Sequence, residues 1–93
     1  MQNLTYFYFD GCPFCAQAEK WLEDIIRERP ELAQVQITRI NERKRPDIAN
    51  KYDYYYVPTF FMDGTKLHEG AATREIVESV LQRAYGGDAQ VVG

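Results

Sequence analysis

The chain has 93 residues, with a formal net charge of −3 and a sequence pI near 5.1. A chain of this length builds one domain, and 45% hydrophobic residues suffice for a core. The acidic balance argues against a protein that holds a polyanion such as nucleic acid. No run is apolar enough to cross a membrane, and the start of the chain does not resemble a secretory signal. We expect a cytoplasmic monomer whose single domain spans residues 1–86, followed by a flexible tail over 87–93.

The first half of the chain predicts a strand followed by a long helix. Residues 4–9 are unbroken β-formers, which is typical of a central strand covered on both faces. Asp10 and Gly11 then turn the chain. Apolar residues at helical spacing predict a helix from Pro13 to about Arg29, which Pro30 ends.

The second half predicts shorter elements and a final helix. They are, in order, a strand over 34–40, a short helix beginning at Pro46, and strands over 59–62 and 65–69 joined by an Asp63-Gly64 hairpin turn. Thr73 can cap the last helix. That helix has one apolar face, formed by Ile76, Val77, Val80, Leu81 and Ala84, and it ends at Gly86-Gly87.

The order of these elements is β-α-β-α-β-β-α. A right-handed crossover makes the first two strands parallel, and the hairpin adds two more strands to the sheet. The sequence therefore predicts an α/β fold with a four-stranded mixed sheet and helices on both of its faces.

Cys12 and Cys15 are too close in sequence for a bridge between them to stabilise the fold much. Because Pro13 suits the first helical position, Cys12 occupies the N-cap. The free N–H groups of Phe14 and Cys15 and the positive end of the helix dipole favour a thiolate there, and a thiolate is what attacks a disulfide. Asp10 would oppose the thiolate, but we expect its carboxylate to be solvated and screened.

Cys15 lies one helical turn after Cys12, at a separation that a disulfide can span without backbone movement. The sequence thus predicts a cycle in which Cys12 attacks a substrate disulfide and Cys15 resolves the mixed disulfide. Half of a zinc site and an incidental pair are the alternatives. Zinc needs about four ligands, and His68 is expected to be an exposed side chain, so we expect no metal.

Three motifs resemble those of the glutaredoxins, in the thioredoxin superfamily. They are Cys12-Pro13-Phe14-Cys15 after a hydrophobic strand, Val57-Pro58-Thr59 before another strand, and a turn at Gly70 before the last helix. The resemblance extends from Leu4 to about Tyr85. It implies a minimal thioredoxin fold and a cis Val57–Pro58 bond lying against the cysteines, where the Val57 backbone pairs with a bound peptide or glutathione.

The resemblance also implies a glutathione site, with two departures. The lysine that glutaredoxins commonly carry before the cysteines is replaced by Phe9-Asp10-Gly11, and Gly70-Ala71-Ala72-Thr73 lacks their aspartate. The N–H groups of Ala72 and Thr73 could still bind a carboxylate at the helix N-terminus. Besides the cysteines, the expected site comprises Pro13, Phe14, Val57, Pro58, Ala71, Ala72 and Thr73, with glutathione as co-substrate and no bound cofactor.

The expected function is reduction of protein disulfides or glutathione mixed disulfides, with glutathione or a flavoprotein reductase as electron donor. A redoxin served by thioredoxin reductase and a binding module without turnover are the alternatives, and Pro13 makes an iron–sulfur cluster less expected. The basic residues Arg39, Arg43, Lys44 and Arg45 indicate a solvated loop, the alternative being contact with a glutathione carboxylate or an acidic partner. The tyrosines Tyr52, Tyr54, Tyr55 and Tyr56 form either core and rim packing or an aromatic contact surface.

Overall fold

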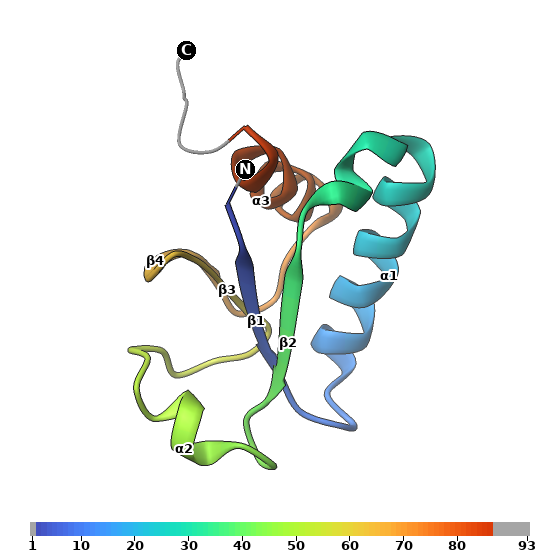
Figure 1. The fold of residues 1–93 in the computed structure, drawn as a ribbon. Coiled ribbons are helices and arrows are strands. Elements are labelled where there is room, and N and C mark those ends of the chain that lie inside the picture. Colours follow the sequence, from blue (N-terminus) through green and yellow to red (C-terminus); the bar gives the residue numbers. More distant parts are fainter. Residues whose placement is uncertain (1, 87–93) are drawn as a thin grey trace.

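A computed structural model describes residues 2–86 of the chain (Figure 1). Its elements are β1 (Leu4–Tyr8), α1 (Pro13–Glu28), the 3₁₀ helix η1 (Pro30–Gln34), β2 (Ile37–Asn41), α2 (Pro46–Ala49), β3 (Thr59–Met62), β4 (Thr65–Glu69) and α3 (Arg74–Tyr85). The predicted order of strands and α-helices is confirmed. The predicted tail over 87–93 lies outside the described residues.

The second strand differs from its prediction over 34–40, because it begins three residues later and ends at Asn41. Pro30 ends α1 but also begins η1, in which the N–H of Leu32 bonds the carbonyl of Arg29 at 2.9 Å. Val35 is buried in the connection rather than in a strand. A buried Val35 therefore reflects how η1 packs against the core, which the alternation of apolar residues could not distinguish from a strand.

The sheet has the strand order β2-β1-β3-β4. β1 runs parallel to β2 and antiparallel to β3, and β3 is antiparallel to β4, so the predicted mixed topology is confirmed. The hairpin turn also has the expected form: Asp63 and Gly64 have φ angles of 49° and 85°, the left-handed backbone that a tight hairpin requires.

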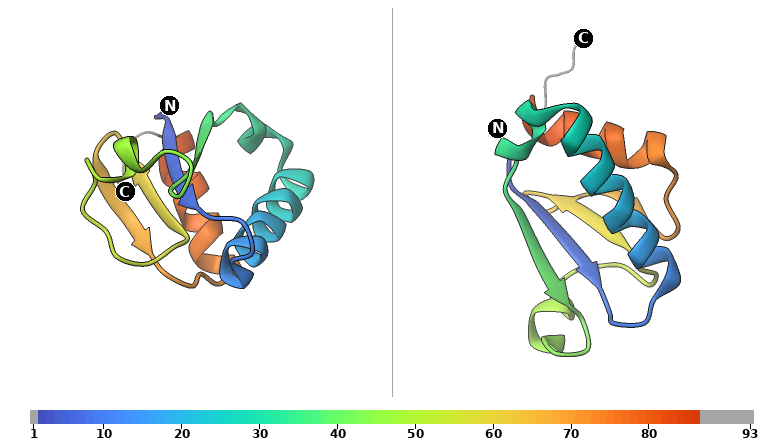
Figure 2. Two further views of the ribbon diagram at one scale, coloured as in Figure 1. Left: turned by 90° about the horizontal axis from the view of Figure 1, so that it is seen from below. Right: turned by 90° about the vertical axis from the view of Figure 1, so that its right-hand side faces the viewer.

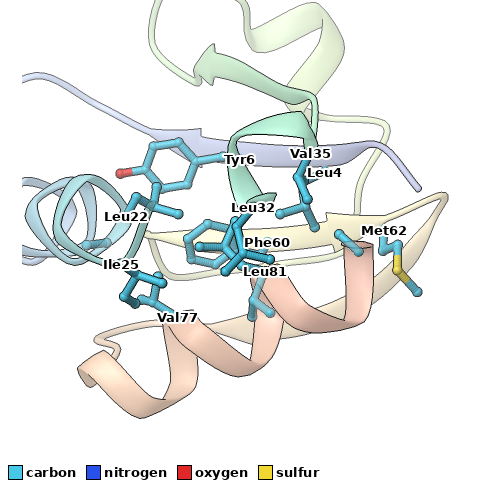
Figure 3. Packing of buried hydrophobic residues seen from close by; sticks show 13 residues of the cluster. Leu4, Tyr6, Leu22, Ile25, Leu32, Val35, Phe60, Met62, Val77 and Leu81 are labelled. Carbon is cyan, nitrogen blue, oxygen red and sulfur yellow. The ribbon is translucent and has the colours of Figure 1, made fainter. Parts of the chain in front are cut away.

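The main core lies between one face of the sheet and helices α1 and α3 (Figures 1 and 3). Leu4 and Tyr6 of β1 and Phe60 of β3 are fully buried there, and the rings of Tyr6 and Phe60 stack at 5.0 Å. Leu22 of α1 and Leu81 of α3 close over them. This core fixes the position of α1, and with it the position of Cys12, relative to the sheet.

Helix α2 lies on the other side of the sheet from α1 and α3 (Figure 2). A smaller aromatic core covers that face of the sheet. Phe7 and Phe61 are buried, and the rings of Tyr52 and Tyr54 each lie 4.8 Å from the ring of Phe7. Two of the clustered tyrosines therefore pack as core and rim. With α2 on this face, the expectation of helices on both faces is confirmed.

Thr73 caps α3 as predicted, since its hydroxyl oxygen accepts the N–H of Ile76 at 3.2 Å. Of the expected inner face of α3, only Ile76 is not fully buried. Within residues 2–86, no helix combines the length and apolar character needed to cross a bilayer.

Replacing Thr73 by alanine should lower the free energy of unfolding by about 0.5–2 kcal/mol, because the N–H of Ile76 loses its acceptor. Urea unfolding followed by circular dichroism measures the loss. Thr73→Ser keeps the hydroxyl and should retain most of the stability. Equal losses in both variants would show that the methyl group, and not the cap, is what matters.

Candidate active site

Cys12 lies at the start of α1, after the turn that leaves β1. Gly11 in this turn has a φ of 88°, a backbone that other residues rarely adopt. Cys12 itself is extended, and its Sγ accepts the N–H of Cys15 at 3.1 Å, while Pro13 takes the first helical position. The sulfur thus stands where a serine or aspartate oxygen usually caps a helix, at the positive end of the helix dipole.

Cys15 is in a different environment, although it is one helical turn away. Both cysteines are buried free thiols, Cys15 being 3% and Cys12 6% exposed. Burial, followed by the hydrogen bond with Cys12, raises the pKa of the Cys15 thiol to about 12. Cys15 therefore stays protonated at neutral pH, while the capping sulfur of Cys12 receives the N–H of Cys15.

The Cys15 environment predicts a loss of stability at alkaline pH. The folded thiol has a pKa of about 12, whereas the unfolded thiol ionises near about 8.5, so the folded state retains a proton that the unfolded state releases. Stability from this group is complete below about pH 8.5 and is lost as pH rises toward 12, by up to about 1.4 kcal/mol per pH unit. Urea unfolding at several pH values between about 8 and 10 measures the slope.

The matched variant for this measurement is Cys15→Ser, in which the slope between about pH 9 and 10 should be smaller than in the wild type. Tyr6 and Tyr54 also have pKa values raised by burial, so they add to the loss only at higher pH. Identical slopes in both proteins would contradict a buried, protonated Cys15.

A groove beside the cysteines contains groups that the sequence analysis did not connect with the site. It has a volume of about 240 Å³, and its lining includes Cys12, Cys15, Tyr6, Glu19 and Arg39. The Tyr6 hydroxyl donates to the Cys15 carbonyl at 3.1 Å, and the guanidinium of Arg39 donates twice to the Glu19 carboxylate, at 2.8 and 3.1 Å. The i, i+4 spacing of Cys15 and Glu19 on α1 was the available signal.

Asp10 is solvated, as expected. Its side chain is 74% exposed, and its carboxylate accepts from the Asn41 amide at 3.3 Å and lies 3.8 Å from the ammonium group of Lys44. Both partners lie at the end of β2 or just after it, so the carboxylate is directed toward that strand. Asp10 also lines the groove that contains Cys12, where its exposure to solvent screens its charge.

The Val57–Pro58 peptide bond is cis, as the resemblance implied. The next residue, Thr59, pairs with Phe7 of β1 on one side and with Glu69 of β4 on the other. Because β3 is antiparallel to β1, the start of β3 lies beside the end of β1. The cis bond therefore lies at the end of the sheet from which the chain turns toward α1 (Figure 1). Direct contact of Val57 with the cysteines stays a prediction.

The segment before α3 reaches the same end of the sheet, since the N–H of Gly70 bonds the carbonyl of Pro58 at 2.8 Å. Ala71 is exposed and Ala72 is half-buried against the core. His68 was expected to be exposed, which is wrong: it is half-buried, and its Nε2 lies 3.1 Å from the Gly70 carbonyl and 2.9 Å from that of Ala71. The imidazole stabilises the turn at Gly70 and Ala71. The position of His68 in the predicted strand did not indicate this role.

Several exposed residues belong to the segments at this end of the sheet. Pro13 is exposed and Phe14 is 54% exposed, both in the first turn of α1. Tyr55 and Tyr56, which precede the cis bond, are 84% and 71% exposed, so the tyrosine cluster divides between packing and surface. No three His, Cys, Asp or Glu side chains within residues 2–86 gather as they would around a metal ion.

The basic residues 43–45 are solvated, and they also make side-chain contacts. The guanidinium of Arg43 lies 3.9 Å from the centre of the Phe9 ring, a cation–π contact, and Arg45 pairs with Asp47 at 3.0 Å. Arg39 was grouped with this stretch, but it points to α1 and forms the ion pair with Glu19. Its position in β2, opposite Tyr6, accounts for the difference.

Comparison with known proteins decides the family. A thioredoxin from Methanocaldococcus jannaschii is 33% identical over 82 residues, which are 87% of this chain and 94% of that protein. The chain belongs to the thioredoxin superfamily. Human Glutaredoxin-3 is 27% identical over 88 residues; these cover 90% of the chain but only 25% of Glutaredoxin-3. No protein-family model matches the sequence.

Solved structures agree with this assignment to the thioredoxin superfamily. A thioredoxin-like protein from Clostridium perfringens has a TM-score of 0.66 and 27% identity, and the match covers all of this chain and 79% of that one. The expected minimal thioredoxin fold is thereby confirmed, and the glutaredoxin-like resemblance has support from both named relatives. As a member of this superfamily, the chain is a thiol–disulfide oxidoreductase.

Proposed function

We propose that this protein reduces protein disulfides or glutathione mixed disulfides by a dithiol mechanism, with Cys12 as nucleophile and Cys15 as resolving residue. The observation that carries the proposal is the contrast between the two sulfurs. Cys12 Sγ caps the helix and accepts an N–H at the positive end of the helix dipole, whereas burial keeps the Cys15 thiol protonated. Cys12 is therefore placed to act as the nucleophile, and Cys15 to act afterwards as the resolving thiol.

In the first step the Cys12 thiolate attacks one sulfur of the substrate disulfide. The bond from Cys12 to that sulfur forms, the substrate S–S bond breaks, and the other substrate sulfur leaves as a thiolate, which takes up a proton. The leaving thiolate is the natural acceptor for the proton of Cys15, because that proton must depart before Cys15 can act.

In the second step the Cys15 thiolate attacks Cys12 Sγ. The 12–15 disulfide forms, the mixed disulfide breaks, and the substrate departs with its second sulfur reduced. Two electrons have then passed from the cysteine pair to the substrate. Two glutathione molecules, or the dithiol of a flavoprotein reductase, restore both thiols, and a cytoplasmic compartment would supply such donors.

The substrate would lie along the surface formed by Val57, Pro58 and the first turn of α1. The N–H and C=O groups of Val57 have no hydrogen-bond partner within residues 2–86, so they are free to pair with a peptide backbone. The exposed Pro13 and Phe14 offer apolar contact beside the sulfur. The N–H groups of Ala72 and Thr73 remain candidates for a glutathione carboxylate, together with Ala71 in the same turn.

Two coupled assays test the proposal and separate the electron donors. Each follows NADPH consumption during reduction of a small mixed disulfide, one with glutathione and glutathione reductase and the other with thioredoxin reductase. Turnover in the first assay identifies a working glutaredoxin despite the absent lysine and aspartate. Turnover only in the second identifies a redoxin served by thioredoxin reductase, and silence in both would favour a binding module.

A further inference from the structure

A single carboxylate holds the chain just before the cis bond. Oε2 of Glu69, the last residue of β4, accepts the backbone N–H of Tyr55 at 2.5 Å and that of Tyr56 at 3.0 Å. These are the two residues that immediately precede Val57. Glu69 also pairs in register with Thr59, whose hydroxyl donates to the carbonyl of Tyr56. The peptide groups on both sides of Tyr56 are therefore tied to the sheet through side chains.

The carboxylate is itself held in place. Nζ of Lys66 donates to Oε1 of Glu69 at 2.7 Å and to the carbonyl of Asp53 at 3.1 Å, so it joins β4 to the start of the same segment. The hydrogen bond from Lys66, with those from the N–H groups of Tyr55 and Tyr56, lowers the pKa of Glu69 to about 2. Glu69 consequently remains an ionised acceptor at every pH at which a thiol reductase works.

This arrangement is unusual because the segment it holds buries little. Tyr55 and Tyr56 are 84% and 71% exposed, so side-chain packing does not fix their backbone. The next residue, Val57, has an N–H and a C=O without partners within residues 2–86. The restraint from Glu69 therefore ends at the residue directly before Val57, whose own N–H and C=O stay free to pair.

We infer that Glu69 is a positioning residue for substrates with a polypeptide backbone: its carboxylate fixes Tyr55 and Tyr56 so that the Val57 peptide groups are held ready to pair. The inference rests on the proposed function and adds to it a residue that prepares the site for polypeptide substrates. A disulfide within an extended peptide can use the Val57 groups, whereas a small disulfide without amide groups cannot. Glu69 touches neither sulfur, so it should act on binding and not on thiol exchange.

The test compares two substrates in single-turnover reactions of the pre-reduced protein without glutathione, because glutathione would convert a small disulfide into a mixed disulfide that carries peptide groups. KM and kcat then stand for the half-saturating substrate concentration and the limiting rate. One is an oxidised peptide with several residues on each side of its cysteine, and the other is bis(2-hydroxyethyl) disulfide, which has no peptide group. Glu69→Ala should raise KM for the peptide by about five- to tenfold, the effect of about one lost hydrogen bond, with kcat changed less than about twofold. Its rate with the small disulfide should stay within about twofold of the wild type.

Three further measurements separate positioning from folding. Glu69→Gln keeps an acceptor oxygen and should recover part of the peptide KM, and Glu31→Ala, which breaks an exposed ion pair with Arg29 in η1, should change neither substrate's kinetics. Amide hydrogen exchange of Tyr55 and Tyr56 should accelerate in Glu69→Ala and slow again in Glu69→Gln. Thermal unfolding of each variant confirms that the protein assayed is folded.

Either of two results would overturn the inference while the proposed function stands. One is an equal loss of activity toward the peptide and the small disulfide, which would make Glu69 a residue of general stability. The other is an unchanged peptide KM in Glu69→Ala. A wild-type protein inactive toward both substrates would overturn the proposed function and, with it, this inference.

Discussion

Replacing Cys12 by serine should reduce disulfide reduction by several orders of magnitude, to the uncatalysed background. The serine oxygen can still cap α1 through the N–H of Cys15, so helix and fold should be preserved. A hydroxyl at this position is not ionised at neutral pH and does not attack sulfur. The coupled assays measure the loss, and circular dichroism checks that the variant is folded.

Cys15→Ser provides the matched control, because it removes the resolving thiol but keeps the nucleophile. This variant should form a mixed disulfide with the substrate and stop there, with a mass increase located at Cys12 in a tryptic peptide. Wild-type protein should show only the 12–15 disulfide after turnover. Full activity in Cys12→Ser, or a mixed disulfide on Cys15 of the wild type, would reverse the roles assigned to the two sulfurs.

The largest stability effect is expected for Phe60→Ala. Phe60 is fully buried in the centre of β3, and its ring stacks on that of Tyr6 at 5.0 Å (Figure 3). Removing a buried phenylalanine ring costs about 3–5 kcal/mol, through lost transfer energy and the cavity that remains. For a domain with about 5–15 kcal/mol of total stability, the midpoint of thermal unfolding should decrease by about 20 °C.

Phe14→Ala is the matched stability control, since the same ring is removed from a position that is 54% exposed. Its free energy of unfolding should change by no more than about 0.5 kcal/mol. Calorimetry or urea unfolding of the three proteins gives both values. A loss in Phe60→Ala as small as that in Phe14→Ala would mean that the sheet does not depend on the packing between β3 and α3.

Local sequence signals predicted most of the elements, because the forces behind them act over a few residues. Pro13 and Cys12 fix the start of α1, the Asp63-Gly64 turn supplies the left-handed backbone of the hairpin, and Thr73 caps α3. The cysteine pair followed from the same reasoning, since a helix N-terminus presents its own N–H donors to the residue that caps it. The strand predicted over 34–40 was misplaced because one alternating pair does not distinguish a strand from η1.

The sequence by itself thus determined most of the strands and helices and the capping position of Cys12, while the tertiary structure decided how their ends meet. Only the register of β3 with β4 brings Glu69 to the backbone of Tyr55 and Tyr56, and only the pairing of β1 with β2 sets Arg39 beside Tyr6, within reach of Glu19. Residues far apart in the chain carry no shared periodicity or turn signal. Their contacts arise when the sheet assembles and the core closes around it, which is why the restraint on the Val57 segment could be found only in the folded molecule.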